Sequence, residues 1–120
     1  MKKVLIVDDS ETVRTQVGRA LVDAGFEVVG AGDGVEGLQR AQQSSFALVL
    51  LDINMPRMGG LELLDKLKQG AETKHVPVLV LTTEVQESMI ERAKKAGAAG
   101  WIVKPVKMDL LVAAVSKVAA

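Results

Sequence analysis

The chain has 120 residues, 48% of them hydrophobic, and its 15 acidic residues balance its 15 basic ones, so its formal net charge is zero. This length predicts one domain over residues 1–120, and the neutral balance argues against a protein that binds nucleic acid or a membrane surface through a basic face. The lack of cysteine excludes disulfides and thiolate-bound metals, and no apolar run approaches the ~18–20 residues of a membrane span, so we expect a soluble, cytoplasmic protein.

Short apolar runs alternate with amphipathic segments five times along the chain. The expected strands are residues 3–7, 27–31, 46–51, 78–81 and 99–103. The expected helices are residues 11–24, 35–43, 61–69, 84–96 and 108–118. This alternation predicts an α/β fold with a five-stranded parallel sheet and helices on both faces. Right-handed crossovers restrict the topology, and we expect the flavodoxin-like (βα)5 order 2-1-3-4-5.

Each expected helix has an apolar stripe at helical spacing, which we expect to face the sheet. The predicted inward residues are Val13, Val17, Leu21, Ala24, Leu38, Ala41, Leu63, Leu64, Leu67, Met89, Ile90, Ala93, Leu110, Leu111, Ala114, Val115 and Val118. The expected strands are apolar without alternation, which is typical of strands buried on both faces.

Four of the expected strands end in residues that can bind phosphate or a metal ion. These residues are Asp8 with Asp9, then Asp52, Thr82 and Lys104. Open α/β sheets bind their ligands outside the carboxyl ends of the strands. The expected strand order places the two N-terminal aspartates beside Asp52, with Thr82 next to it and Lys104 reaching in from the edge strand.

The three carboxylates predict a cation site, because they repel one another unless a cation lies among them. Their hard oxygen atoms, without nearby histidine or cysteine, favour Mg²⁺ over zinc. We expect Asp9 and Asp52 to be direct ligands and Asp8 to act partly through water. The alternative for Asp8 and Asp9 is helix capping, since aspartate commonly precedes a helix.

The other strand-end residues fit phosphoryl chemistry. Asp52 can act as a nucleophile, because aspartyl phosphates are a known covalent form. Thr82 could donate its hydroxyl to a phosphoryl oxygen, and Lys104 could pair with a carboxylate or phosphate. The alternatives are an aspartate that opens a turn, a threonine that caps the next helix and a solvated surface lysine. These separate alternatives do not explain why all of these residues lie at strand ends.

Four segments resemble those of response-regulator receiver domains, in the order of that family and across almost the whole chain. The segments are Val7-Asp8-Asp9-Ser10, Leu51-Asp52-Ile53-Asn54-Met55-Pro56, Leu81-Thr82-Thr83-Glu84 and Gly97-Ala98-Ala99-Gly100-Trp101-Ile102-Val103-Lys104-Pro105. Within the family, the chain looks most like the single-domain, CheY-like chemotaxis regulators.

The resemblance implies a phosphorelay function. Asp52 would accept a phosphoryl group from a phosphohistidine on a sensor histidine kinase, here a CheA-like one. Thr82 and Lys104 would bind the phosphoryl oxygens, and the Lys104–Pro105 bond would be cis. The implied Mg²⁺ ligands are Asp8, Asp9, Asp52 and the backbone carbonyl of Asn54. Such a protein is not an enzyme, because it catalyses only its own phosphorylation and slow self-dephosphorylation. The resemblance implies that Asn54 and Glu84 tune the rate of self-dephosphorylation.

The resemblance also implies an output surface formed by the fourth helix, the fifth strand and the fifth helix. Thr82 and Trp101 would be the switch residues, although tyrosine or phenylalanine is commoner at the latter position. A buried indole is larger and needs a partner for its N–H group. Further candidates for this surface are Gln86, Met89 and Met108, although the two methionines could equally fill the core. The implied partner is a downstream protein such as a flagellar motor switch component, bound by a monomer.

Three other readings compete with a chemotaxis receiver. Residues 32–37 match G-x-G-x-x-G, the fingerprint of a dinucleotide-binding turn, but they follow the second strand and leave the other strand ends unexplained. A Mg²⁺-dependent phosphatase with an aspartate nucleophile usually has an acid two residues further on, where this chain has Asn54. A generic phosphorelay receiver unrelated to chemotaxis is the third.

Overall fold

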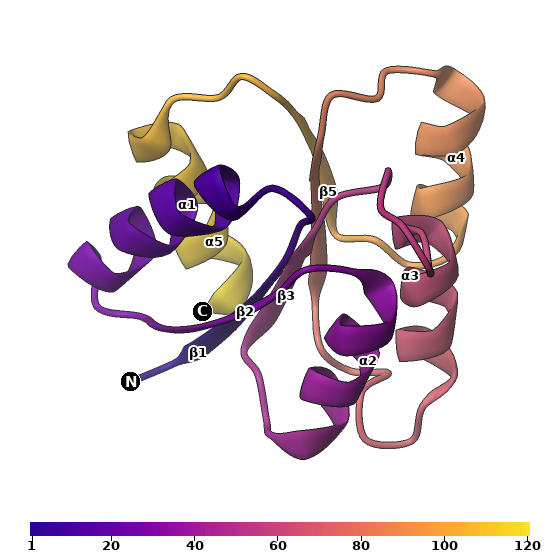
Figure 1. Cartoon of the computed structure of the whole chain (residues 1–120), viewed down its shortest axis with the longest axis horizontal. Coiled ribbons are helices and arrows are strands. Elements are labelled where there is room, and N and C mark those ends of the chain that lie inside the picture. Colours follow the sequence, from indigo (N-terminus) through magenta and orange to yellow (C-terminus); the bar gives the residue numbers. More distant parts are fainter.

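Five parallel strands form a single sheet in the order β2-β1-β3-β4-β5 (Figure 1). The structure is a computed structural model and describes residues 1–120. The strands are β1 (Lys3–Val7), β2 (Glu27–Ala31), β3 (Leu48–Leu51), β4 (Val78–Thr82) and β5 (Gly100–Val103). The helices are α1 (Glu11–Asp23), α2 (Gly34–Gln43), α3 (Gly60–Gln69), α4 (Glu87–Lys95) and α5 (Met108–Ala119). The predicted flavodoxin-like topology is confirmed.

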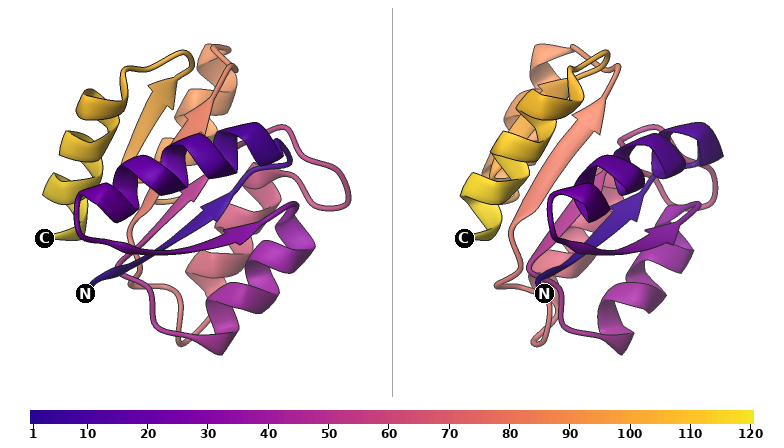
Figure 2. Two further views of the ribbon diagram at one scale, coloured as in Figure 1. Left: turned by 60° about the vertical axis from the view of Figure 1, so that its left-hand side comes forward. Right: turned by 90° about the vertical axis from the view of Figure 1, so that its left-hand side faces the viewer.

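The helices cover both faces of the sheet. Helices α1 and α5 lie on one face, and α2, α3 and α4 lie on the other (Figures 1 and 2). Two apolar clusters fill the spaces between the layers, and successive strand residues such as Ile6 and Val7 belong to different clusters. Both faces of the inner strands are therefore buried, which explains why their sequences are apolar without alternation.

The strand register brings the expected site residues to one edge of the sheet. Val7 pairs with Leu51, so Asp8 and Asp52 each follow the last residue of adjacent strands. The backbone N–H of Asp52 donates to the carbonyl oxygen of Val7 at 2.9 Å. The N–H of Asp8 likewise donates to the carbonyl oxygen of Ala31 at 3.0 Å. These two bonds continue the ladder one residue past the strands and hold both aspartates at the carboxyl end of the sheet.

Two predicted boundaries were wrong by more than one residue. β3 begins at Leu48 rather than residue 46, because its pairing with β1 begins at Val4. α4 begins at Glu87 rather than residue 84. Residues 83–86 form a loop, because the N–H of Glu84 donates to the hydroxyl of Thr82 and is held out of a helical turn.

Two residues expected in the core are exposed. Leu110 is 60% exposed, because α5 turns Leu111, Val115 and Ala119 toward the sheet and Leu110 lies beside that stripe. Ala24 follows the last residue of α1 as its C-cap and is also exposed. None of the five helices has the length and apolar character that crossing a membrane requires.

Candidate functional site

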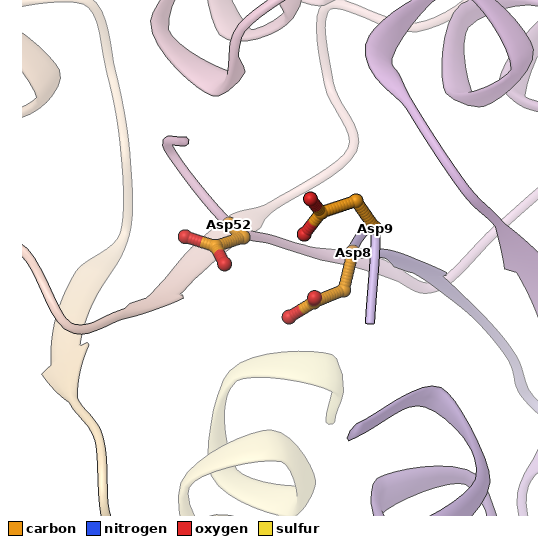
Figure 3. A group of neighbouring side chains, drawn as sticks. All are labelled: Asp8, Asp9 and Asp52. Carbon is orange, nitrogen blue, oxygen red and sulfur yellow. The ribbon is translucent and has the colours of Figure 1, made fainter. Parts of the chain in front are cut away.

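Three aspartates form an acidic cluster at the carboxyl end of the sheet (Figure 3). Asp8 and Asp9 follow β1, Asp52 follows β3, and one carboxylate oxygen from each lies within 4.8 Å of the others. Asp8 and Asp52 are buried, with 3% and 8% of their surface exposed, whereas Asp9 is exposed. The structure therefore brings together the three carboxylates that the sequence placed at neighbouring strand ends.

Backbone N–H groups fix the two buried carboxylates. The N–H of Ser10 donates to Oδ1 of Asp8 at 2.9 Å. The N–H groups of Ile53 and Asn54 donate to Oδ1 of Asp52 at 2.7 and 3.4 Å. In both aspartates Oδ1 accepts the backbone hydrogen bonds, and Oδ2 accepts a hydrogen bond from the ammonium of one lysine that follows another strand.

That lysine is Lys104, which follows β5. Its Nζ lies 2.9 Å from Oδ2 of Asp8 and 3.1 Å from Oδ2 of Asp52, and its side chain is only 18% exposed. Burial alone would lower the pKa of Lys104, but the hydrogen bonds to the two carboxylates outweigh it and raise that pKa above its ordinary value. The lysine is therefore charged and fixed between the two buried acids, and is not a solvated surface residue. The Lys104–Pro105 bond is cis, as the resemblance implied.

The cluster fits a hard divalent cation. Its donors are carboxylate oxygens from three residues, without imidazole or thiolate, and this set is typical of Mg²⁺ rather than zinc. The exposed side of the cluster, at Asp9, leaves room for the water ligands that Mg²⁺ keeps. The alternative role of helix capping belongs to Ser10, whose hydroxyl accepts the N–H of Val13 at 3.2 Å.

Thr82 and Trp101 are connected through one residue of the loop between β4 and α4. The hydroxyl of Thr82, which is fully buried, accepts the N–H of Glu84 at 3.3 Å. The indole Nε1 of Trp101 donates to the carbonyl oxygen of Glu84 at 3.1 Å. This carbonyl is the partner that a half-buried indole needs. Both predicted switch residues therefore hold the same peptide segment, from opposite ends of Glu84.

The remaining output candidates lie in different environments. Gln86 is exposed at the N-cap of α4. Met89 packs with Trp101 against the apolar cluster beneath α4, whereas Met108 packs against the cluster on the opposite face of the sheet. The methionines therefore contribute to the core, as their alternative reading predicted. Val85, the one apolar residue of the loop between β4 and α4, is 62% exposed.

The glycine motif at residues 32–37 is occupied by the protein's own backbone. The N–H of Gly34 donates to the carbonyl oxygen of Met58 at 3.2 Å, and a Cβ on Gly34 would overlap that oxygen. A Cβ on Gly37 would lie 2.9 Å from a methyl group of Val7. Close packing explains both glycines, and the turn has no open cradle for a pyrophosphate.

Sequence reasoning missed one ion pair near the site. Arg57, in the loop after β3, binds Asp33, which precedes α2, with its Nη2 2.8 Å from Oδ2 of Asp33. The sequence placed Asp33 in a turn and Arg57 in a loop without partners. Their opposite charges in loops that follow β2 and β3, near the same edge of the sheet, are the only signal that could have suggested the pair.

Comparison with known proteins shows the family of this chain. The response regulator receiver domain family matches residues 4–116. Chemotaxis protein CheY-3 of Vibrio cholerae is 42% identical over 104 residues, which cover 86% of this chain and 80% of that protein. Transcriptional regulatory protein PdtaR of Mycobacterium tuberculosis is 36% identical over 115 residues, covering 95% of this chain and 55% of that protein. The structure of Vibrio cholerae chemotaxis protein CheY4 has a TM-score of 0.93 and 41% identity, and the match covers 98% of each chain.

Proposed function

Because this chain belongs to the response regulator receiver domain family, we propose that it is a phosphorelay receiver whose phosphoacceptor is Asp52. Receiver domains are signalling modules and not enzymes in their own right. The phosphoryl group would come from a phosphohistidine on a sensor histidine kinase. A P–O bond to a carboxylate oxygen of Asp52 forms as the P–N bond breaks, and the released imidazole takes up a proton.

The observation that supports this proposal best is the position of Lys104 between Asp8 and Asp52. An ammonium in contact with the acceptor carboxylate can move onto a phosphoryl oxygen as negative charge arrives there. Phosphoryl transfer depends on positioning and charge neutralisation more than on covalent chemistry by the protein. Thr82, buried at the end of the adjacent strand, would donate its hydroxyl hydrogen to another phosphoryl oxygen.

Mg²⁺ is the proposed cofactor. When bound, it would neutralise charge on the carboxylates and on the transferring phosphoryl group. We assign its protein ligands to the acidic cluster and to one backbone carbonyl. The assigned residues are Asp8, Asp9, Asp52 and Asn54. Asp8 already accepts Ser10 N–H and Lys104, so we expect it to bind the cation partly through water.

A labelling experiment tests the assignment of Asp52. The protein is incubated with Mg²⁺ and acetyl phosphate, and its mass is measured before and after treatment with base, which hydrolyses acyl phosphates. The wild type should gain one phosphoryl group that base removes, and Asp52→Asn should gain none. Asp65→Asn, an aspartate of α3 paired with Arg92, is the matched control and should be labelled normally. Full labelling of Asp52→Asn would refute the proposal.

We further propose that the phosphorylated protein signals in chemotaxis, as a monomer in the cytoplasm. Two of the similar proteins described above are chemotaxis proteins, and the structural match with CheY4 covers 98% of both chains. The kinase would be CheA-like, and the downstream partner a protein such as a flagellar motor switch component. The downstream partner would bind the surface formed by α4, β5 and α5.

The alternative is a phosphorelay outside chemotaxis, which the similarity to PdtaR supports. Phosphoryl transfer kinetics distinguish the two. A CheA-type kinase should transfer its phosphoryl group to this chain much faster than an unrelated histidine kinase does. Equal or slower transfer from the CheA-type kinase would favour the alternative.

A further inference from the structure

Residues 53–59, in the loop between β3 and α3, are folded back on themselves. The N–H of Gly60 donates to the carbonyl oxygen of Ile53 at 2.8 Å, which closes the base of the loop. The N–H of Met58 donates to the carbonyl oxygen of Pro56 at 2.8 Å, which tightens its tip. The loop begins directly after Asp52, so its position affects the acidic cluster.

Two contacts hold the tip of this loop against the start of α2. One is the backbone hydrogen bond from Gly34 to Met58, and the other is the ion pair of Arg57 with Asp33. Both Nε and Nη2 of Arg57 lie 2.8 Å from Oδ2 of Asp33. The other oxygen of Asp33, Oδ1, accepts the N–H of Glu36 at 2.9 Å and so caps α2. A single carboxylate therefore joins the helix N-terminus to the loop.

The backbone at Arg57 is unfavourable in the absence of such contacts. Its φ is 65°, and it is the one residue other than glycine with a positive φ in this chain. A left-handed conformation is costly for a long side chain and persists where the surrounding structure imposes it. The hydrogen bonds at Met58 and the ion pair with Asp33 are the contacts that impose it here.

We propose that Asp33 and Arg57 are positioning residues for the cation site, because their ion pair holds the loop that presents the backbone carbonyl of Asn54. This inference rests on the proposed function, which assigns that carbonyl as a Mg²⁺ ligand. Neither side chain touches the cation. Breaking the pair would loosen the loop tip and leave the Gly34–Met58 hydrogen bond as its one remaining polar contact with α2.

The sign of the effect separates positioning from simple electrostatics. Removing the positive charge of Arg57 near a cation site should strengthen Mg²⁺ binding if Coulomb forces alone acted. Loss of loop positioning should weaken it. Arg57→Ala is the informative variant, since alanine has a Cβ and so meets the same penalty at positive φ.

The test measures Mg²⁺ binding by titration calorimetry in four proteins besides the wild type. These are Arg57→Ala, Asp33→Ser, the double variant and Arg92→Ala. Serine at position 33 can still cap α2 but cannot pair with arginine as an anion. Arg92→Ala is the matched control, because it removes a similarly exposed arginine from an arginine–aspartate pair between α4 and α3.

We expect Arg57→Ala and Asp33→Ser each to bind Mg²⁺ about threefold more weakly, a loss within the range that a partly exposed ion pair can contribute. The double variant should be little weaker than either single one, and Arg92→Ala should match the wild type. In Mg²⁺-free protein, the amides of Gly34 and Met58 should exchange hydrogen faster in Arg57→Ala than in the wild type.

Unchanged or tighter Mg²⁺ binding by Arg57→Ala would overturn the inference and leave the proposed function intact. Additive losses in the double variant would also overturn it, because the residues would then act separately. If the wild type itself bound no Mg²⁺, the proposed cofactor would be wrong and the inference would fail with it.

Discussion

Lys104 and Asp52 are in contact although they follow strands that are not neighbours. β4 lies between β3 and β5, and Nζ of Lys104 nevertheless lies 3.1 Å from Oδ2 of Asp52. The same ammonium also binds Asp8, at 2.9 Å. In the metal-free protein this lysine is the cation that offsets the repulsion between two buried carboxylates.

Replacing Lys104 by methionine should therefore destabilise the metal-free protein at neutral pH. We expect the free energy of unfolding to fall by about 3 kcal/mol, the lower end of the cost of removing one partner from a buried ion pair. Saturating Mg²⁺ should recover more stability in the variant than in the wild type, because the metal supplies the missing positive charge. Urea denaturation with and without Mg²⁺ measures both effects. Equal stability of the two proteins without metal would contradict this account.

Asp9 should have the opposite effect on stability. It is exposed, its side chain has no ion pair or hydrogen bond, and it lies within the acidic cluster. Asp9→Asn removes one of three like charges, so the metal-free variant should be more stable by about 0.5 kcal/mol, the scale of exposed charge interactions. The same change should weaken Mg²⁺ binding. Thermal unfolding and titration calorimetry measure the two effects, and a less stable variant without metal would show that Asp9 has a structural role.

Much of the fold follows from local patterns. The run from Val4 to Val7 is apolar throughout because both faces of β1 are buried, and this property is visible in the sequence. The strand order then determines which strand ends meet, so the proximity of Asp8 and Asp52 could be predicted although they are 44 positions apart (52 − 8). Hydrophobic pattern and topology are enough to locate this site.

Two of the features that were mispredicted or missed, the start of α4 and the pairing of Asp33 with Arg57, depend on contacts of loop residues. The segment after Thr82 has helical character in its sequence. However, the Thr82 hydroxyl and the Trp101 indole bind the N–H and the carbonyl of Glu84, and α4 begins only at Glu87. The pairing of Asp33 with Arg57 depends on how two loops meet. Periodicity describes the elements that a loop joins, but it does not describe the path of the loop.

Asp33 should make stability depend on pH in the acid range. Hydrogen bonding from the N–H of Glu36, with a further contribution from Arg57, lowers the pKa of Asp33 below its ordinary value of 3.8. The stability that its ionised form contributes is therefore complete above the unfolded-state pKa. It is lost as the pH falls through the lower, folded-state pKa.

The comparison of wild type with Asp33→Asn isolates this charge, because asparagine keeps a side-chain oxygen that can cap α2. The difference in free energy of unfolding between the two proteins should be larger at neutral pH than at about pH 3. Urea denaturation at the two pH values measures it. Since other carboxylates titrate in both proteins, their contributions cancel, and a difference that does not change with pH would contradict the assignment.

Trp101 should report the state of the proposed phosphoacceptor site through Glu84. Beryllofluoride with Mg²⁺ mimics an acyl phosphate, and Thr82 would move toward it to donate its hydroxyl. Because that hydroxyl also accepts the N–H of Glu84, and the carbonyl of Glu84 accepts the indole N–H, movement of Thr82 should alter the surroundings of Trp101. The emission of Trp101, the single tryptophan, should therefore change when beryllofluoride binds.

Thr82→Val tests whether the signal follows this route. Valine has nearly the shape of threonine but no hydroxyl, so it can neither bind the phosphoryl mimic nor accept the Glu84 N–H. We expect this variant to lose most of the emission change while still binding Mg²⁺, and Thr82→Ser, which keeps the hydroxyl, to retain it. Beryllofluoride binding is verified independently by fluorine NMR in each protein. A full emission change in Thr82→Val would mean that the signal reaches β5 without Thr82. The remaining connection would then be Lys104, which binds Asp52 directly and lies three residues after Trp101.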